Sequence, residues 1–215
     1  MTSIMRREFS GGEGAMLLLH GLGSSGKDLL PLAEALDKGK PRVALFANAP
    51  LRPVAMKGGE SIPAWFDLDR LEGGRMQVRE DQFRESVRFV LEIMDDLLQE
   101  GFAPEEVCLL GFSQGAGVAI AAGVEANHPL LGVAALSGYF PAGLMPRKAA
   151  PLFVFMAHGT EDDVVSIDYA RRTKEALEKR QAQVEWREYP MGHSACLEEV
   201  RDLEAWILRR RGALI

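Results

Sequence analysis

The chain has 215 residues, 47% of them hydrophobic, so it can bury a core of ordinary size and is not intrinsically disordered. Its 25 Lys and Arg residues against 31 Asp and Glu residues give a formal net charge of −6, which excludes the basic surface that nucleic-acid binding requires. The two cysteines are too few for a disulfide framework and favour a reducing compartment.

The N-terminal segment carries charged residues where a secretion signal needs an unbroken apolar stretch. We therefore expect a cytoplasmic protein. No apolar run approaches the roughly 18 residues that a membrane span requires, so we expect no stable membrane insertion.

Apolar runs of strand length alternate with amphipathic stretches, and no linker or repeat divides the chain. Residues 1–215 are therefore predicted to form one α/β domain. Near-continuous apolar strands are typical of a mostly parallel sheet with helices on both faces. The predicted strands are Ala15–Leu19, Val43–Ala47, Val107–Leu110, Leu131–Leu136, Leu152–Met156 and Gln183–Tyr189. The predicted helices lie near Lys27–Leu36, Gln77–Gln99, Ala116–Ala126, Asp168–Lys179 and Cys196–Arg209.

A long stretch rich in proline and glycine, Asn48–Arg75, separates the second predicted strand from the longest predicted helix. Loops of this length inside a compact domain are usually functional. We therefore expect this stretch to contribute to a site.

The first of two glycine motifs, Gly21–Gly26, fits G-x-G-x-x-G between a strand and a helix, which is the pattern of a dinucleotide-binding loop. Such a loop normally has an acidic residue about 20 positions further on, at the end of the second strand. The chain has no Asp or Glu there before Glu60. A dinucleotide-dependent oxidoreductase therefore stays an alternative that has the glycine loop but lacks the acidic residue.

The second motif, Gly111–Gly115, fits G-x-S-x-G between a predicted strand and a helix of small residues. An abrupt strand-to-helix turn presents Ser113 in a strained conformation, and the flanking glycines let the chains pass closely. The motif predicts a nucleophilic serine. The alternative is a serine that caps a helix.

A serine nucleophile needs a general base, normally an imidazole that a carboxylate orients. In the chain order of α/β-hydrolases the base comes last, which selects His193 among the four histidines. The acid should follow the strand Leu152–Met156, where three carboxylates compete. Spacing does not choose among Glu161, Asp162 and Asp163. A metal site is a poor alternative, because no H-x-x-x-H or C-x-x-C pattern occurs.

With these motifs assembled, the sequence resembles the phospholipase/carboxylesterase family, which includes bacterial carboxylesterases and acyl-protein thioesterases. The resemblance spans nearly the whole chain and consists of blocks in the order of the family. These blocks are Leu19–Gly23, Ala49–Val54, Ile62–Asp67, Gly111–Gly115, His158–Gly159 with Asp162 and Val164–Val165, and Tyr189–His193.

The resemblance implies an α/β-hydrolase fold without a separate cap domain, and an acyl-serine mechanism that needs no cofactor. It assigns Ser113 as nucleophile, His193 as base and Asp162 as acid. It also places the oxyanion hole on the backbone N–H groups of Leu22 and Gln114.

We expect a carboxylesterase for short to medium acyl chains whose activity extends to thioesters. Trp65 and Phe66 with Val164 are candidates for an apolar acyl channel, and the alternative is that the two aromatic residues pack their loop onto the sheet. Two alternatives remain to test: a main role as lysophospholipase or acyl-protein thioesterase, and a non-catalytic binding protein. The chain is also a candidate homodimer. The predicted partner is a small-molecule ester or thioester.

Overall fold

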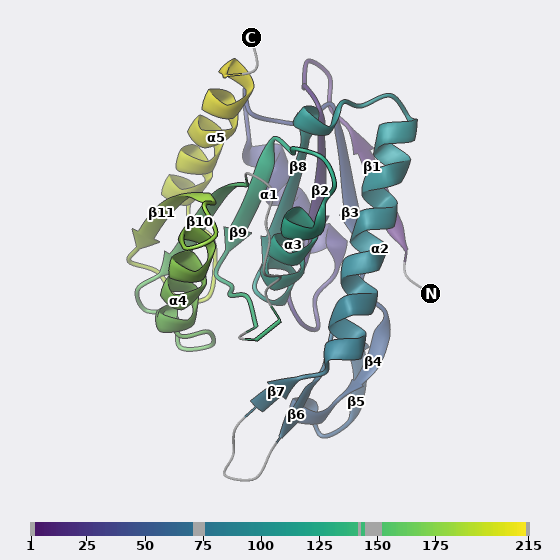
Figure 1. Ribbon diagram of the computed structural model, residues 1–215, viewed down its shortest axis with the longest axis vertical. Helices are drawn as coiled ribbons and strands as arrows, with labels where there is room; N and C mark the ends of the chain where they lie inside the picture. Colours follow the sequence, from purple (N-terminus) through teal and green to yellow (C-terminus); the bar gives the residue numbers. More distant parts are fainter. Residues whose placement is uncertain (1–2, 71–75, 142, 145–151, 214–215) are drawn as a thin grey trace.

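A seven-stranded sheet in the order β1-β3-β2-β8-β9-β10-β11 forms the centre of the molecule (Figure 1). The computed structural model describes residues 3–70, 76–141, 143–144 and 152–213. Six strands run parallel, and β1 runs antiparallel to β3 at one edge. The strands are β1 (Ile4–Glu8), β2 (Ala15–Leu19), β3 (Val43–Ala47), β8 (Val107–Phe112), β9 (Gly132–Leu136), β10 (Phe153–Gly159) and β11 (Gln183–Tyr189). The predicted mostly parallel sheet is confirmed.

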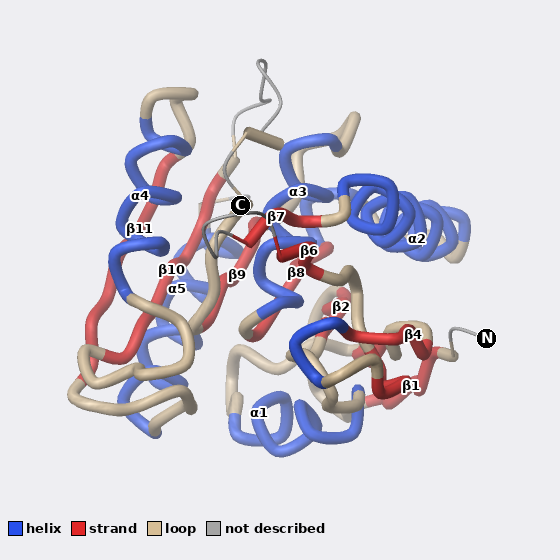
Figure 2. Tube along the Cα trace, turned by 90° about the horizontal axis from the view of Figure 1, so that it is seen from below, coloured by secondary structure: helices blue, strands red, loops and turns tan. Residues whose placement is uncertain are grey.

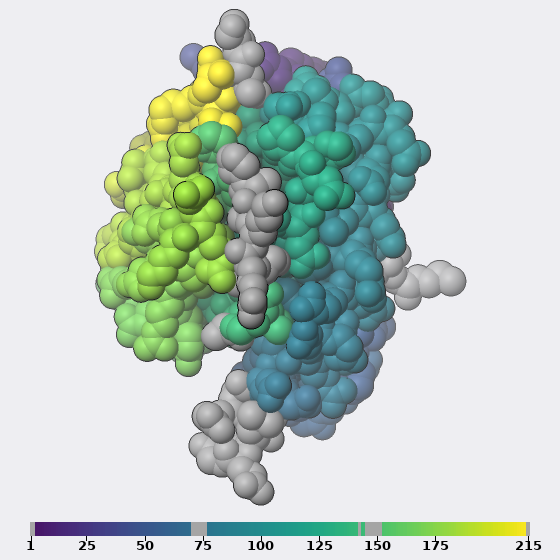
Figure 3. Space-filling model, in the orientation of Figure 1, coloured from purple at the N-terminus to yellow at the C-terminus, as the bar shows by residue number. Residues whose placement is uncertain are grey.

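Helices cover both faces of the sheet (Figure 2). Side chains alternate along β2, so that Leu17 and Leu19 join one apolar cluster with α2, α3 and α4, while Met16 and Leu18 join another with α1 and α5. In the space-filling view, residues of α2 and α4 form much of the near face (Figure 3). The helices are α1 (Leu30–Ala35), α2 (Glu80–Gln99), α3 (Gln114–Glu125), α4 (Ile167–Glu178) and α5 (Leu197–Gly212).

The edge strand β1 was not predicted, because it lacks the apolar run that marks β2, β3, β8, β9 and β10. Four of its five residues are exposed, and Ile4 retains 42% exposure. Its residues pair from Ile4 opposite Ala47 to Glu8 opposite Val43. Backbone pairing with β3 rather than side-chain burial therefore defines this strand.

The stretch Asn48–Arg75 contains short strands that the sequence did not predict. One hairpin joins β4 (Leu51–Val54) to β5 (Glu60–Pro63), and a second pairs β6 (Leu68–Arg70) with β7 (Met76–Val78). Residues 71–75 lie outside the described residues. Both hairpins lie at the lower end of the sheet in Figure 1.

The lower end of the sheet is also the carboxyl end of its parallel strands (Figure 1). The loops after β2, β8, β10 and β11 meet there, beside the two hairpins. In parallel α/β sheets this end carries the binding and catalytic groups. Among the described residues, no helix combines the length and apolar composition needed to cross a membrane.

Candidate active site

Ser113 occupies the sharp turn between β8 and α3. Its backbone has φ 55° and ψ −118°, a region that residues with a Cβ rarely adopt. A Cβ at Gly111 would collide with the carbonyl oxygen of Gly115, and a Cβ at Gly115 would collide with that of Leu19. The turn therefore requires glycine at both positions, and the strain is held in place by packing of α3 against β8 and β9 on one face of the sheet.

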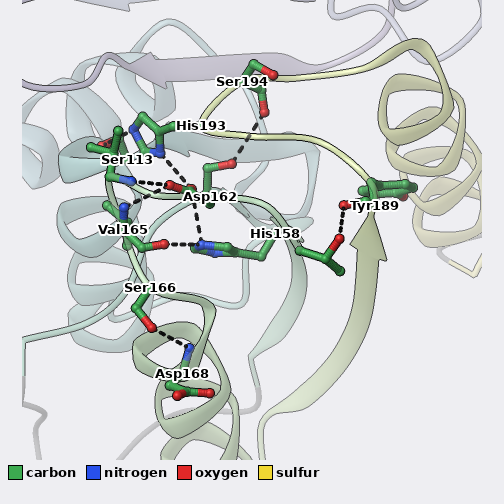
Figure 4. A network of polar contacts seen from close by, with 12 residues as sticks. Ser113, His158, Asp162, Val165, Ser166, Asp168, Tyr189, His193 and Ser194 are labelled. Atoms are coloured by element: carbon green, nitrogen blue, oxygen red, sulfur yellow. Dashed lines mark hydrogen bonds and ion pairs between the residues drawn. The ribbon is translucent and has the colours of Figure 1, made fainter.

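A continuous chain of hydrogen bonds joins Ser113, His193 and Asp162 (Figure 4). Nε2 of His193 lies 2.9 Å from Oγ of Ser113, and Nδ1 lies 2.7 Å from Oδ2 of Asp162. An ionised carboxylate only accepts hydrogen bonds, so Nδ1 of His193 carries the ring proton. Nε2 is then free to accept the proton of the Ser113 hydroxyl, as a general base must.

The Asp162 side chain is fully buried, at 0% exposure, although the residue lies in a loop. Its Oδ1 accepts hydrogen bonds from the backbone N–H groups of Val164 at 2.9 Å and Val165 at 2.8 Å. Burial raises the pKa of Asp162, but the hydrogen bonds from Val165, His193 and Val164 outweigh it and hold the pKa below its usual value. The structure therefore places an ionised carboxylate against His193.

The other two candidate carboxylates, Glu161 and Asp163, are exposed. Residues that follow one another in an extended loop point in different directions, and only Asp162 reaches His193.

Backbone hydrogen bonds join the loop that carries Asp162 to the loop that carries His193. The N–H of Thr160 donates to the carbonyl of Tyr189 at 2.8 Å, and that of Glu161 donates to Met191 at 3.1 Å. A Cβ at Gly159 would collide with the Met191 carbonyl. The distance between acid and base is therefore set by backbone contacts between β10 and β11.

The loop after β2 passes directly over the serine. A Cβ at Gly21 would lie 3.2 Å from Cβ of Ser113. No described residue accepts a hydrogen bond from the N–H of Leu22. Gln114 is the first residue of α3, so its N–H belongs to the first turn of a helix, where N–H groups have no intrahelical partner. Both predicted oxyanion donors thus come from backbone beside Ser113.

The remaining glycines of the Gly21–Gly26 motif hold the same loop against its neighbours. Gly23 donates through its N–H to the carbonyl of Pro63 at 2.8 Å, and Gly26 donates to Oδ1 of Asn48 at 2.8 Å. A Cβ at Gly26 would approach the backbone of β3 at 3.0 Å. Close packing of the loop against β3 and β5 therefore accounts for these glycines.

Sequence reasoning missed a buried network that supports this loop. His20 accepts the N–H of Ala49 at Nε2, at 3.0 Å, and its Nδ1 lies 2.6 Å from the Gly21 carbonyl. Nε1 of Trp65 donates to the His20 carbonyl at 2.8 Å. The side chain of Gln114 accepts the Trp65 N–H at 2.8 Å and donates to the Phe66 carbonyl at 2.7 Å. No local sequence pattern links these residues.

The predicted substrate-binding residues lie in different surroundings. Trp65 is 0% exposed and Phe66 is 4% exposed, and both belong to the apolar cluster under α2. Their burial favours the alternative that they pack the loop onto the sheet. Val164 is 68% exposed and stands two residues after Asp162. Direct contact of any of the three with substrate stays a prediction.

Neither cysteine takes part in the hydrogen bonds of this site in the described residues. Both cysteines are free, and Sγ of Cys196 accepts a hydrogen bond from the N–H of Glu199 at the start of α5. Within the part of the chain that the structure describes, no three His, Cys, Asp or Glu residues are grouped to hold a metal ion.

Comparison with known proteins gives concordant matches. The family model described as phospholipase/carboxylesterase matches residues 10–209. Acyl-protein thioesterase 1 of Mycosarcoma maydis is 33% identical over 214 residues, covering 89% of each chain. Carboxylesterase SOBER1 of Arabidopsis thaliana is 31% identical over 204 residues, covering 91% of this chain and 90% of its own. The crystal structure of SOBER1 superposes with a TM-score of 0.82 over 93% of this chain and all of that one, at 30% identity.

Proposed function

Because the chain belongs to the phospholipase/carboxylesterase family and is a hydrolase of the carboxylesterase or thioesterase type, we propose that it cleaves esters through an acyl intermediate on Ser113. The observation that carries the proposal is the unbroken hydrogen-bond chain from Oγ of Ser113 through His193 to Asp162. The strained backbone of Ser113 supports it, because such strain is typical of functional positions.

In the proposed reaction, His193 takes the hydroxyl proton while Oγ of Ser113 attacks the substrate carbonyl. The N–H groups of Leu22 and Gln114 stabilise the negative charge on the tetrahedral intermediate. The imidazolium, held by ionised Asp162, then protonates the leaving alcohol or thiol, and the acyl group stays on Ser113. A water molecule activated by the same base releases the acid. Every proton passes through His193, so the mechanism requires no cofactor.

We propose carboxylic esters with short to medium acyl chains as substrates, with activity on thioesters. The similarity to acyl-protein thioesterases supports the thioester part, and a thioester has the same carbonyl geometry with a better leaving group. We further propose that residues 1–215 act as one domain, in the cytoplasm. The two unpaired cysteines are compatible with a reducing compartment. A homodimer rests on the family resemblance alone, and light scattering after size exclusion tests it.

The proposal is tested by hydrolysis of 4-nitrophenyl esters from acetate to palmitate, and of an acyl thioester, by the wild type and Ser113→Ala. We expect a short-chain optimum in the wild type and a loss on the order of 10⁶ in kcat for the variant. A long-chain optimum would point to lipid or acyl-protein substrates. Hydrolysis that survives in Ser113→Ala would overturn the mechanism.

A fluorophosphonate probe separates the proposed enzyme from a binding protein that keeps the fold. The probe reacts with an activated serine, so it should label the wild type at Ser113 and leave Ser113→Ala unlabelled. A wild type that stays unlabelled and inactive would favour the non-catalytic alternative.

A further inference from the structure

His158, close to the end of β10, lies on the side of Asp162 opposite His193 (Figure 4). Its side chain is fully buried, at 0% exposure. Nε2 of His158 lies 2.8 Å from the Val165 carbonyl oxygen and 3.3 Å from Oδ2 of Asp162. Both oxygens only accept hydrogen bonds, so Nε2 carries the ring proton and points it between them. Asp162 therefore faces N–H groups from two imidazoles, His193 and His158.

Asp162 accepts three hydrogen bonds, and Nε2 of His158 lies at ion-pair distance beside them. Oδ1 accepts from Val164 and Val165 at 2.9 and 2.8 Å. Oδ2 faces His193 at 2.7 Å and His158 at 3.3 Å. A carboxylate offers about four acceptor positions. Three of them accept hydrogen bonds, and the His158 N–H, which donates to the Val165 carbonyl, lies next to the fourth.

The second ring nitrogen of His158 shows that core packing alone does not explain the residue. Nδ1 is buried and has no hydrogen-bond partner among the described residues. An unpaired buried polar atom lowers stability, whereas an apolar side chain of similar shape avoids that loss. Histidine at this position therefore places the unpaired Nδ1 in the core at a cost in stability, and supplies one N–H donor at Nε2.

The titratable and charged groups around His158 come from two loops, one helix and one strand. They are Asp162 and His193 in the loops, Arg171 on α4 and Glu188 on β11. Arg171 and Glu188 bind each other at 3.0 Å, so they largely offset each other's charge at the ring. Burial lowers the pKa of His158, which favours the neutral ring.

We propose that His158 is a positioning residue that acts through Asp162. Its N–H, held by the Val165 carbonyl, points past the carboxylate and offsets part of its negative charge, so that Asp162 stabilises the imidazolium of His193 without taking its proton. The inference rests on the proposed function, because Asp162 has this task only if Ser113 and His193 carry the reaction.

Two substitutions of similar size distinguish the effect of losing the Nε2–H donor from the effect of altered packing. His158→Gln places an amide N–H at the reach of Nε2, whereas His158→Leu fills the site without a donor. The experiment measures kcat/KM for 4-nitrophenyl butyrate from pH 5 to 9, the urea midpoint, and labelling by a fluorophosphonate for the wild type and both variants.

We expect His158→Gln to stay close to the wild type. His158→Leu should lose on the order of tenfold in kcat/KM on the acid side of the profile, because a larger share of the free enzyme then holds His193 protonated. Its acid limb should also move to higher pH, because Asp162 without this donor holds the imidazolium more strongly. A merely structural role would lower the urea midpoint without moving the acid limb.

Equal losses in both variants with an unmoved acid limb would overturn the inference, as would wild-type behaviour of His158→Leu. If His158→Leu does not fold, His158→Asn, whose amide is one methylene too short, replaces it with the same expectation. Failure of the proposed function is recognised separately. In that case the wild type itself shows no Ser113-dependent hydrolysis or labelling, and both proposals fall.

Discussion

His20 and His158 stand near the carboxyl ends of β2 and β10, both are 0% exposed and both precede a glycine, yet their hydrogen bonds differ. His20 uses both ring nitrogens on backbone groups, the Gly21 carbonyl and the Ala49 N–H. His158 uses one nitrogen, which bonds the Val165 carbonyl beside Asp162, and its other nitrogen has no partner in the part of the chain that the structure describes. His20 therefore positions backbone, whereas His158 lies beside the carboxylate proposed to stabilise the imidazolium of His193.

The same difference extends to the surroundings of each histidine. On the oxyanion side, the polar side-chain groups of Trp65, Ser86 and Gln114 all have partners. Among the described residues, Nδ1 of His158 beside Asp162 and both carboxylate oxygens of Glu199, in the first turn of the helix after the His193 loop, are buried without one. The proposed oxyanion donors are backbone N–H groups whose support is paired, whereas the acid–base side contains titratable groups that are not. The first side should therefore respond to loss of support, and the second to pH.

The largest effect is expected from the acid–base side. Asp162→Asn should lower kcat on the order of 10⁴-fold, because an amide no longer stabilises the imidazolium or fixes the tautomer of His193. Asp163→Asn is the matched control, since Asp163 is exposed next to it in the same loop. Steady-state kinetics on the same ester should show the control near wild type. Similar losses at both positions would contradict the assignment of the acid.

On the oxyanion side the reacting groups are N–H groups, so backbone rather than side-chain chemistry should matter. Leu22→Pro removes one donor and should lower kcat about 10²–10³-fold. Leu22→Ala keeps the donor and should lose far less. Kinetics with urea midpoints for both variants check this expectation. A loss in Leu22→Ala as large as that in Leu22→Pro would show that the leucine side chain, and not its N–H, is needed.

The strands that form the core were predictable because both faces of the sheet are covered. All five residues of β2 and of β3 are buried, so each strand appears as an unbroken apolar run. Strand β1 and the two hairpins were missed because backbone pairing defines them: four of five residues of β1 are exposed, and β4 and β5 have only one buried residue between them. The other edge strand, β11, was predicted, so position at the edge alone does not hide a strand.

The candidate site was predictable to a similar extent. The steric demands of the turn mark Ser113, and chain order marks His193, since both depend on local sequence or sequence order. The choice of Asp162 over its neighbours required the family resemblance. The partners of Gln114 lie 48 and 49 positions away in sequence, so no local pattern contains those contacts. The supporting network was therefore invisible until the fold was known.

A smaller effect is expected from Gln114→Ala, which tests the support on the oxyanion side. The substitution keeps the backbone N–H but removes two side-chain hydrogen bonds to the loop of Trp65 and Phe66. At about 1 kcal/mol for each bond, we expect a lower urea midpoint and roughly tenfold lower kcat/KM. A loss comparable to that of Ser113→Ala would mean that the Gln114 side chain itself takes part in the reaction.

The smallest effect on activity is expected at Glu199, the other unpaired group on the acid–base side. Its side chain is buried in the first turn of α5, and burial raises its pKa to about 8. In the unfolded chain the group titrates near 4.3, roughly the ordinary value for Glu. Between these values the folded state holds a proton that the unfolded state has lost. The free energy of unfolding should therefore fall as pH rises through this window, by at most about 1.4 kcal/mol per pH unit.

Glu199→Gln removes this titration without removing the side chain. The free energy of unfolding of the variant, relative to that of the wild type, should increase from pH 5 to 8 and level off above. Its kcat/KM should stay close to wild type, because Glu199 has no bond to Ser113 or His193 in the described residues. Urea unfolding at a series of pH values measures the difference. A difference that stays constant with pH would mean that the Glu199 carboxylate ionises in the folded state as it does in the unfolded chain. The contrast in pH response between the oxyanion side and the acid–base side would then rest on His158 alone.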